Sequence, residues 1–142
     1  MSGVAEAGED GAFALAIPIR WRDLDPYGHV NNAVYATYLE ECRDELVEGL
    51  LGDAGDAWDY VLARVAIDYR RELTQEDDEV VVRARVAGVG RSSIRLDETV
   101  HTAAGELAAE AEAVLVARDR ETGRSRPLSP AEREAFEAAL PR

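Results

Sequence analysis

Apolar residues recur at every second position between residues 13 and 21, and small or polar residues stand between them. This alternation predicts a strand with one buried face, whose apolar members are Phe13, Leu15, Ile17, Ile19 and Trp21. Pro18 falls within the run. Because proline has no N–H to donate to a central ladder, this strand is expected at or near the edge of a sheet.

After an acidic turn at residues 23–28, the pattern changes to that of an amphipathic helix. Apolar residues with helical spacing alternate with acidic ones, and they are Tyr35, Leu39, Cys42, Leu46 and Leu50. Either Asn31 or Asn32 is expected to cap the helix, because its side chain can accept a first-turn N–H. Gly52 suits the end of the helix, and Trp58 in the next loop is expected to fill the core.

Four further runs predict strands at residues 61–69, 80–86, 92–100 and 109–117, the third less regular because Glu98 interrupts it. Short connections between the later strands favour antiparallel pairing. Ser129 and Glu132 form a capping box with proline between them, which predicts a short C-terminal helix. The order of elements indicates an α+β fold, in which an antiparallel sheet curls around one long helix.

The 142 residues are expected to form a single domain. Residues 1–11 are rich in Gly, Ala and Glu without periodicity, so we expect a disordered tail followed by a domain at residues 12–142. The absence of a long apolar run and of an N-terminal signal pattern favours a cytoplasmic protein with no membrane partner. Cys42 is the only cysteine, which excludes an internal disulfide, and its place in the apolar stripe favours an inert thiol.

The charge of the chain excludes several classes of function. Its net charge of −13 argues against a nucleic-acid partner. All 16 basic residues are arginine, so Schiff-base chemistry, covalent attachment of pyridoxal phosphate and a P-loop are excluded for lack of lysine. Arginine suits bidentate contacts with phosphate or carboxylate, so an anionic small-molecule substrate remains compatible with the sequence.

Candidate chemistry gathers where the first strand meets the long helix. Asp25 stands in the acidic turn, and N–H groups at Asn31, Asn32 or Ala33 begin the helix. Because the first N–H groups of a helix lack intrahelical partners and lie at its positive end, they can stabilise an oxyanion. A carboxylate beside them can activate water or attack an acyl carbon. Alternatively, Asp23 or Asp25 only caps the turn.

Other residues near this turn admit more than one interpretation. His29 can polarise a substrate or act as a general acid, or it can simply form hydrogen bonds within the turn. Tyr35 suits the core first and a pocket wall second. Residues 23–28 match the opening of a calcium loop, but Tyr27 and Val34 occupy ligand positions. A transition-metal site lacks a second nearby histidine, so no metal is expected.

The turn and the helix together carry a resemblance to a known family. RWRDLDPYGHVNNAVYATYLEECRDE resembles the front half of hotdog-fold acyl-CoA thioesterases of the 4-hydroxybenzoyl-CoA thioesterase-like family. The order of elements over residues 12–126 is also similar, including VAIDYRRELTQEDDEVVVRARV and the GRSS segment. The most specific part is the Asp-x-Asp-Pro-x-Gly turn joined to His-Val-Asn-Asn-x-x-Tyr.

The resemblance implies a five-stranded antiparallel sheet wrapped around the long helix. It also implies a homodimer or homotetramer with active sites at the subunit interface. Asp25 would be the catalytic carboxylate, and the backbone N–H of Asn32 would be the oxyanion donor. Substrate contacts are implied at His29, Tyr35, Arg91, Ser92 and Ser93, the last three toward the nucleotide. No cofactor is implied, since coenzyme A enters as part of the substrate.

The substrate and the mechanism stay open at this point. Several family members carry histidine or tyrosine at the position matching Asn32, so the acyl preference is open, and the carrier is either coenzyme A or acyl-carrier protein. Asp25 acts either as general base or as nucleophile. Two other functions remain: a hotdog-fold hydratase acting on enoyl or hydroxyacyl thioesters, and a non-catalytic acyl-thioester-binding module.

Overall fold

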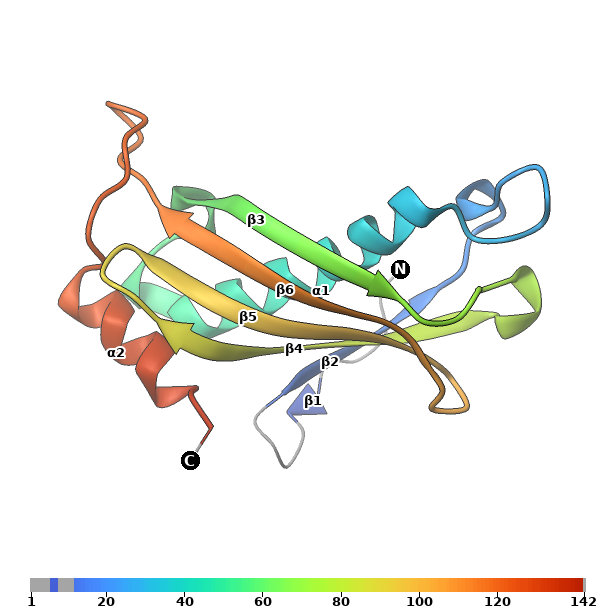
Figure 1. The fold of residues 1–142 in the computed structure, drawn as a ribbon. Coiled ribbons are helices and arrows are strands. Elements are labelled where there is room, and N and C mark those ends of the chain that lie inside the picture. Colours follow the sequence, from blue (N-terminus) through green and yellow to red (C-terminus); the bar gives the residue numbers. More distant parts are fainter. Residues whose placement is uncertain (1–5, 8–11, 142) are drawn as a thin grey trace.

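A computed structural model describes residues 6–7 and 12–141, which form one sheet and two α-helices (Figure 1). The strands are β1 (Glu6–Ala7), β2 (Phe13–Pro18), β3 (Tyr60–Tyr69), β4 (Glu79–Val89), β5 (Ser93–Thr102) and β6 (Leu107–Ala117). The helices are α1 (Asn32–Leu51) and α2 (Pro130–Ala138), with short 3-10 turns η1 (Trp21–Asp23), η2 (Gly52–Ala54), η3 (Ala57–Asp59) and η4 (Gln75–Asp77). The sheet order is β1-β2-β4-β5-β6-β3, with every neighbouring pair antiparallel.

The predicted α+β architecture of five antiparallel strands, a long helix and a short C-terminal helix is confirmed. The two-residue β1 adds a short pairing to the outer side of β2. The expected disorder of residues 1–11 lies outside the described residues, except at Glu6–Ala7, which are β1. As Pro18 indicated, β2 lies close to one edge of the sheet, and among the described residues only β1 lies beyond it.

Strand β2 is shorter than the apolar alternation of residues 13–21 predicted. It ends at Pro18, and Trp21 belongs to η1, where it is 84% exposed. The chain turns here because the carboxylate of Asp23 accepts the backbone N–H of Arg20 at 2.9 Å, which caps the 3-10 turn. The expectation that Trp21 faces the core was therefore wrong.

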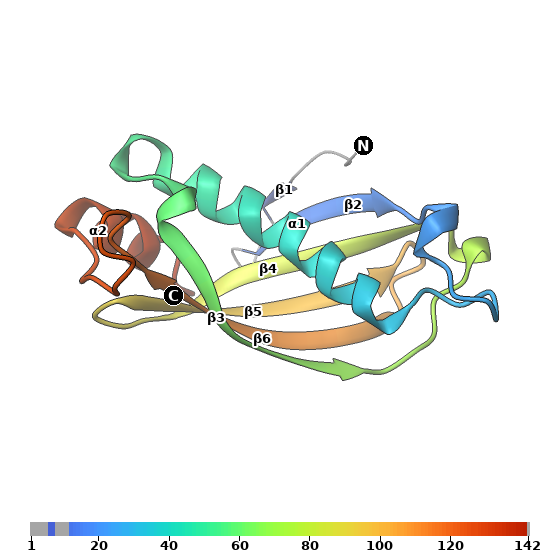
Figure 2. The same ribbon diagram turned by 90° about the horizontal axis from the view of Figure 1, so that it is seen from above.

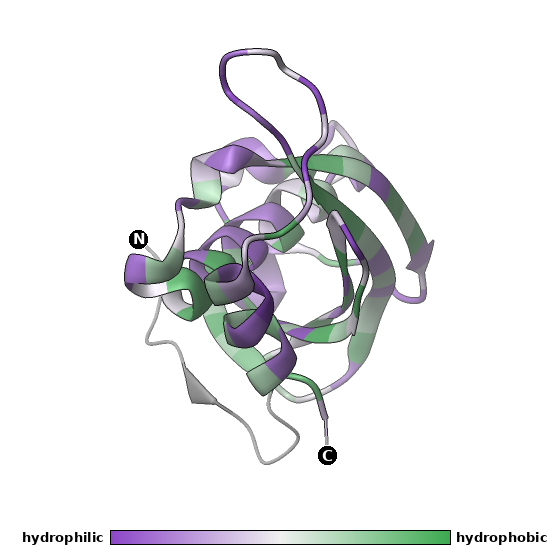
Figure 3. Ribbon diagram, turned by 90° about the vertical axis from the view of Figure 1, so that its left-hand side faces the viewer, coloured by the Kyte–Doolittle hydropathy of each residue, from purple (hydrophilic) through white to green (hydrophobic). Residues whose placement is uncertain are grey.

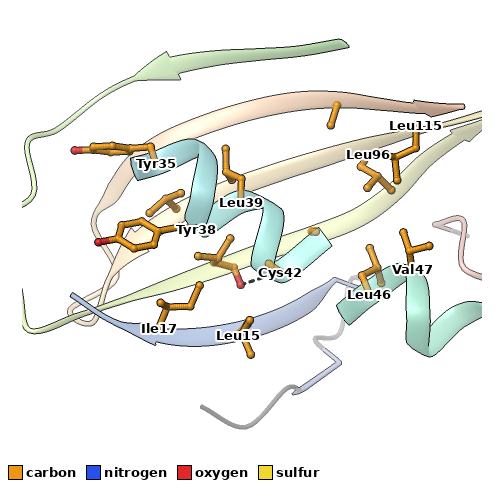
Figure 4. Close-up of a cluster of buried hydrophobic side chains, with 14 of the residues drawn as sticks. Leu15, Ile17, Tyr35, Tyr38, Leu39, Cys42, Leu46, Val47, Leu96 and Leu115 are labelled. Atoms are coloured by element: carbon orange, nitrogen blue, oxygen red, sulfur yellow. Dashed lines mark hydrogen bonds between the residues drawn. The ribbon is translucent and has the colours of Figure 1, made fainter. Parts of the chain in front are cut away.

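Helix α1 lies across the concave side of the sheet (Figures 2 and 3). The side chain of Asn31 accepts the N–H of Ala33 at 2.9 Å, so Asn31 and not Asn32 is the N-cap. One face of the helix enters the core formed with β2, β4 and β5 (Figure 4). Its buried residues are Tyr35, Tyr38, Leu39, Cys42, Arg43, Leu46, Val47 and Leu51. Burial raises the pKa of the Cys42 thiol to about 12, which supports its interpretation as an inert core residue.

An ion pair joins this buried helix face to the sheet. The guanidinium of Arg43 donates two hydrogen bonds of 2.8 Å to the carboxylate of Glu98, and both side chains are almost completely buried. Burial raises the pKa of Glu98, while the guanidinium opposes that rise. Glu98 interrupts the apolar series of β5 because it faces the core and is neutralised there by Arg43.

Strand β3 forms the other edge of the sheet and is poorly covered. A bulge between Leu62 and Arg64 shifts the alternation, so that Leu62, Val65 and Tyr69 lie opposite buried positions of β6. These three side chains are nevertheless 44%, 37% and 46% exposed. Helix α1 packs mainly on β2, β4 and β5, so the inner face of β3 extends beyond it.

The C-terminal helix is held against the start of β3 by a buried carboxylate. Glu132 accepts the hydroxyl of Tyr60 at 2.5 Å and two guanidinium hydrogen bonds from Arg126 at 2.7 and 3.0 Å. The ring of Tyr60 also packs edge-on against Phe136. Tyr60 thus occupies the core position expected for Trp58, which is 81% exposed, and that expectation was wrong.

We predict that the core ion pair is costly to break but dispensable as a pair. Arg43→Ala leaves the carboxylate of Glu98 buried without a partner and should lower the free energy of unfolding by about 3–5 kcal/mol. Arg43→Met combined with Glu98→Leu should stay within about 1 kcal/mol of the wild type, because neither variant side chain carries a charge. Urea unfolding of both variants measures this contrast. A loss below about 1 kcal/mol in Arg43→Ala would contradict it.

The carboxylate of Glu132 should make stability depend on pH. The hydrogen bonds from Arg126, Tyr60 and Ser129 outweigh the effect of burial and lower the pKa of Glu132 to about 2. This is below the pKa of a glutamate in the unfolded chain. Its contribution is therefore complete above about pH 4.5 and is lost as the pH falls toward 2. Unfolding at pH 7 and pH 3 should show Glu132→Gln costing roughly 2 kcal/mol at pH 7 and clearly less at pH 3. An equal cost at both pH values would contradict the prediction.

Candidate active site

Asp25 lies in a tight turn that fixes one of its carboxylate oxygens. Its Oδ1 accepts the backbone N–H groups of Tyr27 at 2.9 Å and His29 at 3.1 Å. Backbone hydrogen bonds from Asp25 N–H to His29 O and from Gly28 N–H to Asp25 O close the same turn. Gly28 adopts φ 85°, a conformation that favours glycine. The Oδ2 atom has no hydrogen-bond partner among the described residues, so Asp25 both caps the turn and keeps one oxygen available.

The neighbouring acid, Asp23, has a different role. It is 5% exposed, and its Oδ2 accepts the hydroxyl of Tyr38 at 2.7 Å as well as the N–H of Arg20. Its backbone carbonyl accepts the N–H of Asn31 at 2.9 Å. Asp23 therefore connects the acidic turn to the first two turns of α1. The alternative prediction, that an acid of this turn has only a structural role, describes Asp23 well.

Within the described part of the chain, the N-terminus of α1 presents one unpaired amide next to this turn in sequence. The N–H of Ala33 donates to the Asn31 side chain, and the N–H of Val34 donates to the Asn31 carbonyl. The N–H of Asn32 has no acceptor among the described residues. Asn32 is the first helical residue, so this amide lies at the positive end of a 20-residue helix. Among the three candidate donors, Asn32 is thus the one left free for an oxyanion.

His29 and Tyr35 lie close to the same end of α1. The imidazole Nε2 of His29 is 3.4 Å from Glu72 Oε2, and the backbone of His29 pairs with Thr74. Tyr35 is 2% exposed and donates its hydroxyl to the carbonyl of Arg71 at 3.0 Å. Tyr35 therefore serves first as a core residue that holds the loop after β3.

Tyr69 joins this group, although it is not among the residues predicted for the site. Its hydroxyl donates to the carbonyl of Asn32 at 3.0 Å, and its ring packs edge-on against Tyr35 with centroids 5.1 Å apart. Tyr69 is 46% exposed at the end of β3. The sequence carried a weak signal for it, because a tyrosine closes an apolar strand directly before the two arginines 70–71.

The three residues expected to meet a nucleotide lie elsewhere. Arg91 and Ser92 lie in the connection between β4 and β5, and Ser93 is the first residue of β5. This connection lies beside α2, where the Arg91 carbonyl accepts the N–H of Leu128 at 2.9 Å. The Asp25 turn lies near the opposite end of the sheet (Figures 1 and 2). The eleven residues of β4 span about 35 Å. A single chain therefore does not bring the two predicted halves of the site together.

The comparison with protein families decides the assignment. The model of the thioesterase-like superfamily matches residues 19–136, which include the Asp25 turn, α1 and the whole of the sheet from β3 to β6. The chain belongs to this superfamily. The resemblance to hotdog-fold acyl-CoA thioesterases is thereby confirmed, and with it the prediction of an enzyme that cleaves thioesters.

Individual relatives agree with the family. The long-chain acyl-CoA thioesterase FadM of Escherichia coli is 29% identical over 127 residues, covering 85% of this chain and 94% of that protein. The chloroplastic acyl-acyl carrier protein thioesterase ATL3 of Arabidopsis thaliana is 28% identical over 92 residues, covering 61% of this chain but only 47% of that protein. The solved thioesterase of Thermus thermophilus, in complex with coenzyme A and Zn, is 38% identical with a TM-score of 0.81. That match covers 93% of this chain and 96% of the Thermus chain.

Two expectations, a cytoplasmic location and the lack of a metal ion, remain predictions. Over residues 6–7 and 12–141, neither helix has the length and hydropathy needed to cross a bilayer. The cytoplasmic location stays a prediction from the sequence. The described side chains of His, Cys, Asp and Glu also form no group of three or more that could hold a metal ion.

Proposed function

We propose that the thioesterase-like chain hydrolyses acyl-CoA at the junction of the Asp25 turn and α1. One observation carries the proposal: a carboxylate with one anchored and one available oxygen lies in the segment that leads directly to an unpaired helix N-terminal amide. The carboxylate provides a base or a nucleophile, and the amide stabilises negative charge on the carbonyl oxygen of the substrate. A thioester is already an activated acyl group, so this pair suffices without a serine or cysteine nucleophile.

The chemistry can proceed by either of two routes through Asp25. As general base, its Oδ2 takes a proton from a water molecule while the water oxygen attacks the acyl carbon. As nucleophile, Oδ2 attacks the acyl carbon itself, and water then hydrolyses the resulting mixed anhydride. In both routes the carbonyl electrons move to the oxygen, where the N–H of Asn32 stabilises them. Their return expels coenzyme A as thiolate, and the products are free acid and thiol.

A homodimer joined along β3 explains the uncovered edge of the sheet. The exposed side chains of Leu62, Val65 and Tyr69 form an apolar face on an edge strand, a combination that favours pairing with another strand. A second copy related by a two-fold axis would pair its own β3 in antiparallel orientation and bury this face on both chains. The two sheets would then form one continuous sheet.

The dimer would also bring together the two separated halves of the predicted site. Antiparallel pairing along β3 turns the end of the partner that carries Arg91, Ser92 and Ser93 toward the end that carries Asp25. Arg118 and Arg124 lie in the loop after β6, also at the Arg91 end of the sheet. Arginines on a chain of net charge −13 provide local positive charge for the phosphates of coenzyme A.

Loss of the Asp25 charge should abolish catalysis without unfolding the turn. In Asp25→Asn the side-chain carbonyl oxygen can still accept the N–H groups of Tyr27 and His29, so stability should change by less than about 1 kcal/mol. The kcat for acyl-CoA hydrolysis should fall by about 10²–10⁴. The measurement is thiol release from short, long and aromatic acyl-CoAs. Equal activity of the variant and the wild type would refute the role of Asp25, and water addition to crotonyl-CoA without thiol release would indicate a hydratase.

The oxyanion donor can be removed by a substitution that the helix accepts. Proline is tolerated at the first helical position, where Asn32 lies, and the preceding Asn31 has the extended ψ of 135° that proline requires. Asn32→Pro deletes the N–H and should lower kcat by about 10²–10³. Asn32→Ala, the matched control, keeps the N–H and should stay within about five-fold of the wild type. Equal losses in both variants would show that the side chain, not the amide, matters.

A charge at the uncovered edge should separate the proposed dimer. Val65→Arg places a guanidinium in the middle of the inner face of β3, where two copies would meet. Sedimentation should show a dimer for the wild type and mainly monomer for Val65→Arg, with loss of thiol release. Ala138→Arg adds the same charge at the exposed end of α2 and should remain dimeric and active. A dimeric Val65→Arg would place the interface elsewhere.

A further inference from the structure

Trp58 is a large exposed aromatic residue on an unusually well-fixed support. Its side chain is 81% exposed in η3. Its backbone N–H donates to Asp56 Oδ1 at 2.9 Å, and Arg120 binds the carboxylates of both Asp56, at 2.6 Å, and Asp59. The N–H of Arg118 also donates to the Asp59 carbonyl at 2.8 Å. Tryptophan is enriched among the residues that carry most of the binding energy of interfaces, so an exposed tryptophan on a fixed backbone is a candidate interface contact.

The position of Trp58 along the chain decides which surface it can reach. It stands two residues before β3, whose outer edge is open. Two copies of β3 paired about a two-fold axis run antiparallel, so full overlap places Tyr60 of one copy opposite Tyr69 of the other. The same relation places Trp58 opposite Arg71, just beyond the end of the partner's strand.

The chain around Arg71 and Glu72 belongs to the candidate active site. The carbonyl of Arg71 accepts the hydroxyl of Tyr35 at 3.0 Å, and Glu72 lies 3.4 Å from the imidazole of His29. Tyr69, whose hydroxyl binds the Asn32 carbonyl, is two residues away. Within one chain Trp58 is far from this group, because the ten residues of β3 alone span about 30 Å.

From this relation we propose that Trp58 completes the active site of the partner subunit, where it packs beside Tyr69 and the His29–Glu72 pair as an apolar wall for the acyl thioester. The inference rests on the proposed dimer and its hydrolase activity, and it adds a residue that each site receives from the other chain. An apolar wall contributed in this way makes every site depend on two chains. Trp58 is a substrate-binding residue in this proposal, because its indole contacts the acyl thioester without taking part in proton transfer.

A cross-linking experiment tests this placement without reference to activity. In the double variant Trp58→Cys with Glu72→Cys, the two thiols of one chain are separated by the length of β3, far beyond disulfide reach. Oxidation should therefore give a covalent dimer on a non-reducing gel. Each single variant should remain monomeric on the same gel, because a two-fold axis does not bring position 58 to position 58. Cys42 is buried and stays silent in all three proteins.

A complementation experiment tests the contribution to catalysis. Trp58→Ala should lower kcat/KM for acyl-CoA about ten-fold or more, and Trp58→Phe should recover most of the loss because it keeps an aromatic wall. Mixed dimers of Asp25→Asn and Trp58→Ala contain one site with both residues intact, if Trp58 acts on its partner. Such mixtures should then regain up to half of the wild-type activity per dimer. If Trp58 serves its own chain, they should not exceed the activity of Trp58→Ala.

The outcomes separate this inference from the proposed function. A dimeric wild type without the cross-link, or mixed dimers without recovery, overturns the role of Trp58 while leaving the hydrolase intact. A loss in Trp58→Ala that disappears with an acyl-pantetheine substrate would show that Trp58 binds the nucleotide, which also overturns it. Cross-linking in a wild type that hydrolyses no acyl-CoA supports the placement and overturns the proposed function. A monomeric wild type overturns both the dimer and the inference.

Discussion

The buried carboxylate of Asp23 holds together the two segments from which the candidate site is built. The carboxylate accepts the hydroxyl of Tyr38 from α1 and the backbone N–H of Arg20. The backbone carbonyl of Asp23 accepts the N–H of Asn31. Buried acceptors with well-placed partners fix their surroundings more firmly than exposed ones, because every broken hydrogen bond leaves a polar group without water. The positions of Asp25 and of the Asn32 amide follow from this connection.

Two neighbouring acids thereby acquire separate roles from burial alone. Asp23 is enclosed and uses its carboxylate for structure, whereas Asp25 is half-buried and uses one oxygen for its turn and keeps the other available. The same division holds at the start of α1, where Asn31 accepts the N–H groups of Ala33 and Val34, and the N–H of Asn32 has no acceptor among the described residues. Among the described residues, capping therefore leaves one N–H without an acceptor at the positive end of the helix, and this is the amide that we propose as the oxyanion donor.

The fold leaves one part of the inner face of the sheet uncovered. Helix α1 covers β2, β4 and β5, with the Arg43–Glu98 pair joining its buried face to β5. The inner face of β3 extends past the helix, with Tyr69 reaching back to Asn32. A single chain thus holds the Asp25 carboxylate and the Asn32 amide at one end of the sheet and the residues predicted to bind the nucleotide at the other. A symmetric pair of chains would bring the two ends together.

The sequence by itself determined the strands, the long helix, the C-terminal capping box and the junction at Asp25, because alternation, helical spacing and turn residues are local patterns. Only the tertiary structure decided where Trp21, Trp58 and Glu98 lie. Hydropathy predicted both tryptophans in the core and made Glu98 an irregularity. In the structure a capped 3-10 turn exposes Trp21, and Tyr60 takes the core position beside Phe136 that was expected for Trp58. Glu98 is buried and neutralised by Arg43. These outcomes depend on contacts between residues distant in sequence, which no local pattern contains. The resemblance already implied the amide of Asn32, and the hydrogen bonds of the folded helix start add that this amide has no acceptor among the described residues.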